Sequence, residues 1–183
     1  VYNGNLLYHG CVPLKEDGNL KSVRIFGRAY KGKGLYEVLE SYVRKGFYAM
    51  DPKEKERGKD IMWYIWLSEN SPLFGKDKMA TFERYFLAEK ETHKEKKNPY
   101  YLLLEDEKVV GKILKEFGLE NEDAHIINGH VPVKCKDGEN PVKCGGKVLV
   151  IDGGFSKAYQ KETGIAGYTL IYNSYGLILA AHK

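Results

Sequence analysis

The spacing of apolar residues changes near Gly118, and this change restricts the chain to a mixed fold. Before Gly118, apolar residues recur every three or four positions, as in the segment 34–47, which is typical of amphipathic helices. After it, short apolar runs such as 147–152 end at glycines, which is typical of strands. The sequence therefore predicts an α/β protein with a helical middle and a strand-rich end.

The predicted elements follow from this periodicity and from turn residues. Helices are expected at 34–47, 53–67, 78–90 and 105–117. Strands are expected at 5–9, 124–128, 147–152, 167–172 and 176–181, with Asn173-Ser174-Tyr175 as a hairpin turn. We expect the C-terminal strands to form one sheet, with residues 33–118 as a helical insertion or cap and 119–183 as the C-terminal strands.

Composition narrows the class of protein. The 183 residues are 43% apolar, enough for a sizeable core, and no apolar run is long enough to cross a bilayer. A net charge of +4 is too small to argue for nucleic acid, so neither nucleic acid nor membrane is an expected partner. Three cysteines cannot all pair, which favours reduced thiols and a cytoplasmic protein. The chain begins at Val1 without a leader and ends directly after an apolar run, so we expect a piece of a longer protein.

Two histidines stand where predicted strands end. His9 precedes Gly10, and His130 follows Gly129, a residue that permits unusual backbone geometry. Strand ends in α/β proteins often hold ligands, and neutral imidazole is a common metal ligand. The spacing alone leaves two interpretations open, a metal site or two hydrogen-bonded structural histidines. On an extended strand, His125 would face away from His130.

Several segments resemble a known enzyme family. The runs 5–14, with His9-Gly10, and 127–132, with Gly129-His130-Val131-Pro132, resemble signatures of the calcineurin-like metallophosphoesterases, and 147–154 is similar to the strand and turn that follow. The segments 71–86, 93–101 and 164–176 resemble the bacterial class III fructose-1,6-bisphosphatases. This similarity extends over nearly the whole chain.

The resemblance implies a layered α/β/β/α sandwich with a two-metal site, and manganese as the metal. His9 and His130 would bind the second metal, so we expect their nitrogens to lie about 3–4 Å apart. The family's Asp-x-His, Gly-Asp-x-x-Asp-Arg and Gly-Asn-His-Glu signatures do not occur in this chain, and Pro132 replaces a further histidine. The catalytic residues and most metal ligands are therefore expected upstream of Val1.

The resemblance also implies the reaction: hydrolysis of fructose 1,6-bisphosphate to fructose 6-phosphate and phosphate, a step of gluconeogenesis. Such a substrate needs cations, and the candidates are Lys76, Lys78 and Arg84, which could equally be surface charges. Asn128 and Asp152 are further site candidates, although Asp152 could instead cap its own turn.

Two other functions stay open. One is a related phosphatase acting on phosphoproteins or dinucleoside polyphosphates, against which the segments specific to class III argue. The other is a noncatalytic binding module derived from a phosphatase, which the absent signatures would favour if the natural chain began near Val1. The 183 residues alone are expected to be inactive, and the oligomeric state stays open, a homo-oligomer included.

Overall fold

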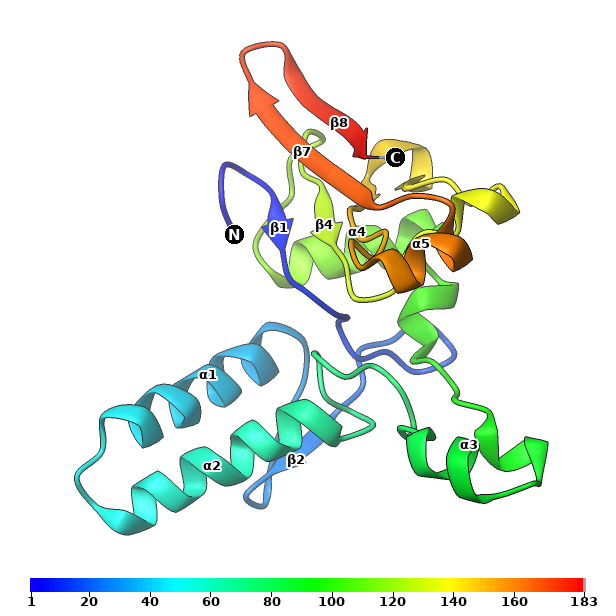
Figure 1. Cartoon of the computed structure of the whole chain (residues 1–183). Coiled ribbons are helices and arrows are strands. Elements are labelled where there is room, and N and C mark those ends of the chain that lie inside the picture. The colour runs from blue at the N-terminus through cyan, green and yellow to red at the C-terminus, as the bar shows by residue number, and fades with distance from the viewer. Residues whose placement is uncertain (183) are drawn as a thin grey trace. The chain divides into compact units, whose positions relative to one another are not determined.

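The chain leaves one structural unit after Gly10 and returns to it at Leu104 (Figure 1). Residues 1–10 and those from 104 onward form this unit, called here the sheet unit. Residues 11–103 form the second, called here the hairpin unit. The structure is a computed structural model that describes residues 1–182, and its helices and strands confirm the mixed α/β class.

A four-stranded sheet organises the sheet unit. Its strands are β1 (Leu6–Leu7), β4 (Ile126–Asn128), β6 (Val148–Val150) and β5 (Val142–Lys143), in the order β1-β4-β6-β5. The first three strands run parallel, and β5 pairs antiparallel with β6. All residues of β4 and β6 are buried, as expected for parallel strands that are covered on both faces.

Helix α4 (Glu107–Glu116) lies in the same unit and agrees with the predicted helix. The Asp106 side chain caps its start by accepting hydrogen bonds from the amides of Lys108 and Val109. Gly118 follows its end with a φ of 79°, a conformation that glycine adopts without steric cost. The apolar stripe of α4 is buried, namely Val109, Val110, Ile113 and Leu114.

The prediction of one C-terminal sheet is wrong. Strands β7 (Gly167–Asn173) and β8 (Gly176–His182) pair antiparallel with each other and form a separate sheet. The predicted turn is correct, since the Asn173 side chain accepts a hydrogen bond from the Tyr175 amide. A single isolated bridge, between Asp152 and Gly167, connects this ribbon to the segment after β6. There the backbones cross closely, because a Cβ on Gly153 would lie 2.6 Å from the Gly167 Cα.

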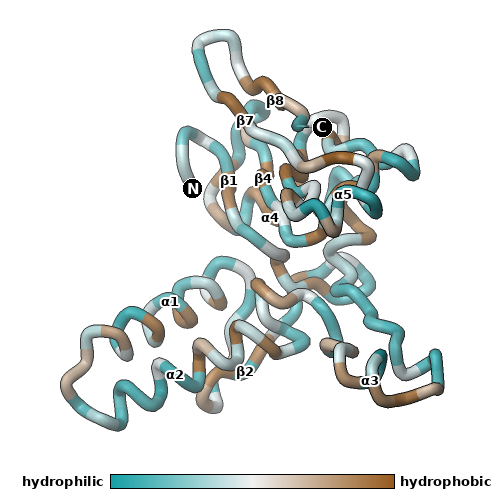
Figure 2. Tube along the Cα trace, viewed as in Figure 1, coloured by the Kyte–Doolittle hydropathy of each residue, from teal (hydrophilic) through white to brown (hydrophobic). Residues whose placement is uncertain are grey.

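The hairpin unit is built from two long helices and a small ribbon. Strands β2 (Val23–Ile25) and β3 (Arg28–Tyr30), which the sequence did not predict, pair antiparallel. Helices α1 (Gly32–Tyr48) and α2 (Pro52–Leu67) match the predicted segments, and Asp51 caps α2 by accepting from the Glu54 amide. Hydrophilic and apolar bands alternate along α1 (Figure 2), as its amphipathic spacing requires.

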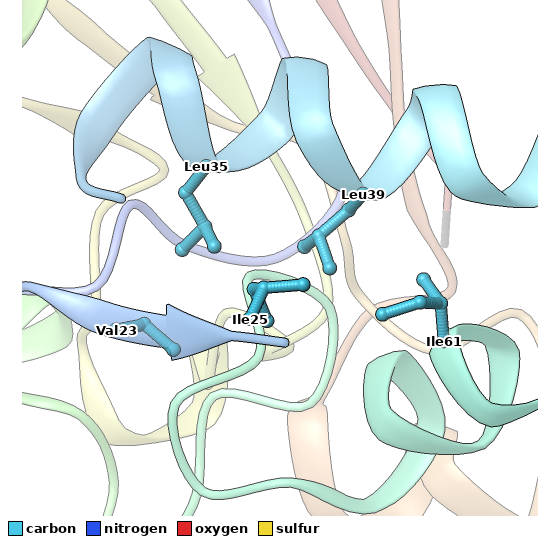
Figure 3. Close-up of a cluster of buried hydrophobic side chains, with 5 residues drawn as sticks. All are labelled: Val23, Ile25, Leu35, Leu39 and Ile61. Carbon is cyan, nitrogen blue, oxygen red and sulfur yellow. The ribbon is translucent and has the colours of Figure 1, made fainter. Parts of the chain in front are cut away.

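Five buried side chains join these elements into a core. Val23 and Ile25 of β2 meet Leu35 and Leu39 of α1 and Ile61 of α2 (Figure 3). Burial of each such side chain contributes about 1.5–3 kcal/mol through removal of apolar surface from water.

The remaining elements are short. Helix α3 (Thr81–Phe86) covers only part of the predicted segment 78–90, and the chain turns extended at Leu87. Helix α5 (Lys157–Thr163) lies between β6 and β7. Single 3-10 turns occupy Lys90–His93, Pro99–Leu102, Cys135–Asp137 and Cys144–Gly146. Within residues 1–182, no helix combines the length and apolarity that crossing a membrane requires.

Candidate metal centre

His9 and His130 converge beyond the ends of two neighbouring parallel strands. Each follows its strand by two residues, since β1 ends at Leu7 and β4 ends at Asn128. The His9 Nε2 and His130 Nδ1 atoms lie 3.1 Å apart, and the ring planes meet at 69°. The expectation that these two rings lie close together is therefore met, although they are 121 positions apart in the sequence.

The backbone beside His130 brings the two loops together. The Gly129 amide donates to the His9 carbonyl at 2.9 Å. The unusual backbone lies at His130 itself, with a φ of 66°, a left-handed conformation that costs about 1–2 kcal/mol for a residue with a Cβ. At Gly129 a Cβ would lie 3.4 Å from the Asp152 Cβ, which is an ordinary van der Waals distance. Strain of this kind concentrates at functional sites.

The separation of the two nitrogens suits two situations. It is that of a hydrogen bond in which one ring donates to the other. It also matches two nitrogens bound to one ion, because ligands at about 2.1 Å that subtend about 90–110° lie roughly 3.0–3.4 Å apart. Within residues 1–182, no group of three or more His, Cys, Asp or Glu side chains could hold a metal ion. The pair thus fits two positions of a larger ligand set.

The rings open into a pocket of about 480 Å³. Besides the histidines, its lining includes Asn128, Asp152, Phe155 and Tyr168. Burial raises the pKa of Tyr168, whose hydroxyl lies 2.8 Å from the Cys135 Sγ. The phenol is therefore neutral at physiological pH and adds no charge to the pocket.

The two further candidates of the sequence analysis lie in this lining. Asp152 caps its own turn, with its Oδ1 accepting from the Gly154 amide at 2.9 Å. Asn128 is 2% exposed, and its Nδ2 donates to the Gly10 carbonyl at 3.2 Å. Its Oδ1 is buried and has no hydrogen-bond partner among residues 1–182.

His125 and His93 form their hydrogen bonds with other residues. The His125 Nδ1 lies 3.1 Å from the Asn5 Oδ1, and burial, followed by the charge of Lys147, lowers its pKa. His93 contacts the Leu87 carbonyl in the hairpin unit.

The candidate substrate-binding cations lie in the hairpin unit, and two of them contact Glu95, a carboxylate that the sequence patterns do not select. The Glu95 carboxylate contacts the Lys76 Nζ at 2.9 Å and the Arg84 guanidinium at 3.2 Å. It also accepts from the Ala80 amide at 3.0 Å, while the Lys78 Nζ donates to the Thr92 carbonyl at 2.7 Å. Lys76 and Arg84 thus share one carboxylate, and the two histidines lie in the other unit.

The pKa of Glu95 is set by burial, by hydrogen bonds and by neighbouring cations. Partial burial alone would raise its pKa, but the Ala80 amide, Lys76 and Arg84 together outweigh burial and hold the pKa below its usual range. Only 15% of this side chain is exposed, so its ion pairs are screened less than pairs in open solvent.

The cysteines form no disulfide within the described chain. Cys11 and Cys144 are buried, and Cys135 is partly exposed. Burial raises the pKa of the Cys11 thiol to about 12, which leaves it protonated and unreactive at neutral pH.

Comparison with known proteins gives one consistent result. A family model described as Firmicute fructose-1,6-bisphosphatase matches residues 1–183. A fructose-1,6-bisphosphatase class 3 of Clostridium botulinum is 61% identical over 183 residues, which are 100% of this chain and 27% of that protein. One of Clostridioides difficile is 61% identical over 182 residues, 99% of this chain and 28% of that protein. The chain therefore spans little more than a quarter of these relatives, and no solved structure matches it.

Proposed function

Because the chain belongs to the Firmicute fructose-1,6-bisphosphatase family, we propose that the whole protein hydrolyses fructose 1,6-bisphosphate to fructose 6-phosphate and phosphate. The names of both relatives support this substrate, and their 61% identity extends over essentially the whole chain. The observation that carries the proposal is the convergence of His9 and His130 at 3.1 Å within a chain matched from end to end.

The proposed fold of the whole protein is a calcineurin-like layered sandwich. In this proposal the parallel strands β1, β4 and β6 belong to its sheet, with the histidines following two of them. The helical insertion predicted over 33–118 corresponds mainly to the hairpin unit, residues 11–103. This unit lies between β1 and β4 in the sequence, as an insertion would, which supports the arrangement.

We assign His9 and His130 as ligands of one divalent ion, with manganese as the proposed metal. Imidazole nitrogen is a suitable ligand for such an ion, and the pair has the required separation. A pair of ions in the complete site would supply positive charge to the phosphate oxygens and acidity to the attacking water. This chain's part is to hold two nitrogens in place, while the remaining ligands and the catalytic residues are proposed to lie elsewhere in the whole protein.

Lys76, Lys78 and Arg84 are proposed to bind the phosphate that does not react. The ion pairs of Lys76 and Arg84 with Glu95 support an anion-binding role, because these two side chains already bind one carboxylate. A substrate phosphate would compete with Glu95 for the same donors. We also propose a cytoplasmic location, which the three unpaired thiols support.

Phosphate release with manganese tests the function. The whole protein should hydrolyse fructose 1,6-bisphosphate, whereas residues 1–183 alone should not, because two ligands cannot hold two ions that each need about four to six. Hydrolysis of dinucleoside polyphosphates or phosphopeptides in place of the sugar bisphosphate would contradict the substrate. Robust turnover by the purified 183-residue chain would contradict a site shared with other parts of the protein.

A further inference from the structure

Asn128 is the polar exception in an apolar strand. It ends β4 after Ile126 and Ile127, and all three residues are buried. A buried amide loses its bonds to water, so such a side chain lowers stability unless the protein supplies partners. Asn128 has a partner for its Nδ2, but its Oδ1 has none among residues 1–182. The buried Asn128 amide therefore lowers the stability of the fold. The hydrogen bond of its Nδ2 atom indicates a role for this side chain.

That bond connects the loops carrying the two histidines. The Asn128 Nδ2 donates to the Gly10 carbonyl at 3.2 Å, directly after His9. One residue further along, the Gly129 amide donates to the His9 carbonyl at 2.9 Å. Asn128 and Gly129, which are adjacent, therefore bind the adjacent residues Gly10 and His9. These two hydrogen bonds hold the backbone segments that carry the His9 and His130 rings.

Asn128 also connects to the third strand of the sheet. Its carbonyl accepts from the Ile151 amide at 2.9 Å, directly before Asp152. The side-chain bond is the part of this arrangement that depends on asparagine, because backbone bonds are available to any residue except proline. Replacing Asn128 should therefore loosen the loop of His9 while leaving the sheet bonds in place.

We propose that Asn128 is a positioning residue, whose bond to Gly10 sets the place of His9 relative to His130 and so determines how tightly the pair holds a divalent metal. This inference rests on the proposed function, which makes the two histidines metal ligands. Groups that orient metal ligands typically affect metal affinity about 10–100-fold when removed.

The test is manganese binding to the whole protein, followed by the loss of the electron paramagnetic resonance signal of free Mn²⁺. Asn128→Leu removes the amide donor at similar size, and it should weaken manganese binding about 10–100-fold. Asn128→Ala removes the donor without added bulk, and it carries the same prediction if the leucine variant does not fold.

Thr163→Val is the matched control. Thr163 is 3% exposed in the same unit, and its Oγ1 lies 2.7 Å from the Ile165 carbonyl. This variant also loses a buried side-chain hydrogen bond, yet it should change manganese affinity less than about threefold.

Two results would overturn the proposal, and they differ in what else fails. Wild-type affinity in both Asn128 variants, with weakened binding in His9→Ala and His130→Ala, would reject the role of Asn128 and leave the metal centre intact. Unchanged affinity in the histidine variants would reject the metal centre itself, and the role of Asn128 with it.

Discussion

Gly46 of α1 and Gly58 of α2 meet backbone to backbone, so closely that a Cβ on Gly46 would lie 2.5 Å from the Gly58 Cα. Both residues are buried where the two helices pack. Only glycine permits this approach, because any side chain at either position would push the helix axes apart.

Gly46→Ala should therefore destabilise the protein despite the better helix propensity of alanine. Overpacking typically costs about 1–3 kcal/mol, which exceeds the roughly 0.5–1 kcal/mol that alanine gains over glycine within a helix. Urea unfolding measures the change. Gly34→Ala is the control in the same helix, since a Cβ there meets nothing within 4 Å, and it should be neutral or stabilising. Equal destabilisation by both substitutions would contradict the close helix contact.

The lowered pKa of Glu95 predicts that the protein loses stability in acid. Its pKa is lower in the folded protein than in the unfolded chain, so its contribution is present in full above the usual value of 4.5. That contribution disappears as the pH falls through the lower, folded-state pKa. Urea midpoints measured between neutral pH and about pH 3 should therefore fall more steeply for the wild type than for Glu95→Gln. Parallel curves for the two proteins would show that the ionisation of Glu95 adds no stability to the folded protein.

Substitution of Arg84 tests whether this residue acts in substrate binding or in the chemical step. If it binds the phosphate that does not react, Arg84→Ala should raise the KM for fructose 1,6-bisphosphate about tenfold or more, with a smaller effect on kcat. Glu95→Gln should lower the KM, because it weakens the internal competitor for the same donors. Lys53→Ala, an exposed charge of α2, is the control and should leave both constants unchanged. An unchanged KM in Arg84→Ala would make this cluster purely structural.

Local patterns predicted the elements that local physics determines. The amphipathic spacing of Leu35 and Leu39 gave α1, and Asp51 before Pro52 gave the start of α2. The β7–β8 hairpin was equally clear from its turn. The short β2–β3 ribbon was missed, because three-residue strands carry little periodicity. The single C-terminal sheet failed because strand patterns do not specify which strands pair.

The candidate site shows the same division. His9 and His130 could be selected because each stands beside a glycine after a predicted strand, and parallel pairing of β1 with β4 then brings them together. Glu95 could not be selected, since it lies in a run of mixed charges that reads as a solvated surface. Its role arises from a fold that returns it to Lys76 and Arg84, which are 19 and 11 positions away.

Manganese-dependent release of phosphate from fructose 1,6-bisphosphate, measured on histidine variants of the whole protein, tests the central claim most directly. His9→Ala and His130→Ala should each lower turnover by orders of magnitude, because loss of a ligand changes both metal occupancy and the acidity of water at the metal. His125→Ala, which lies in the same unit but contacts Asn5, should retain turnover close to the wild type. Wild-type turnover in His9→Ala or His130→Ala, with the fold intact, would contradict the assignment of this pair to the metal.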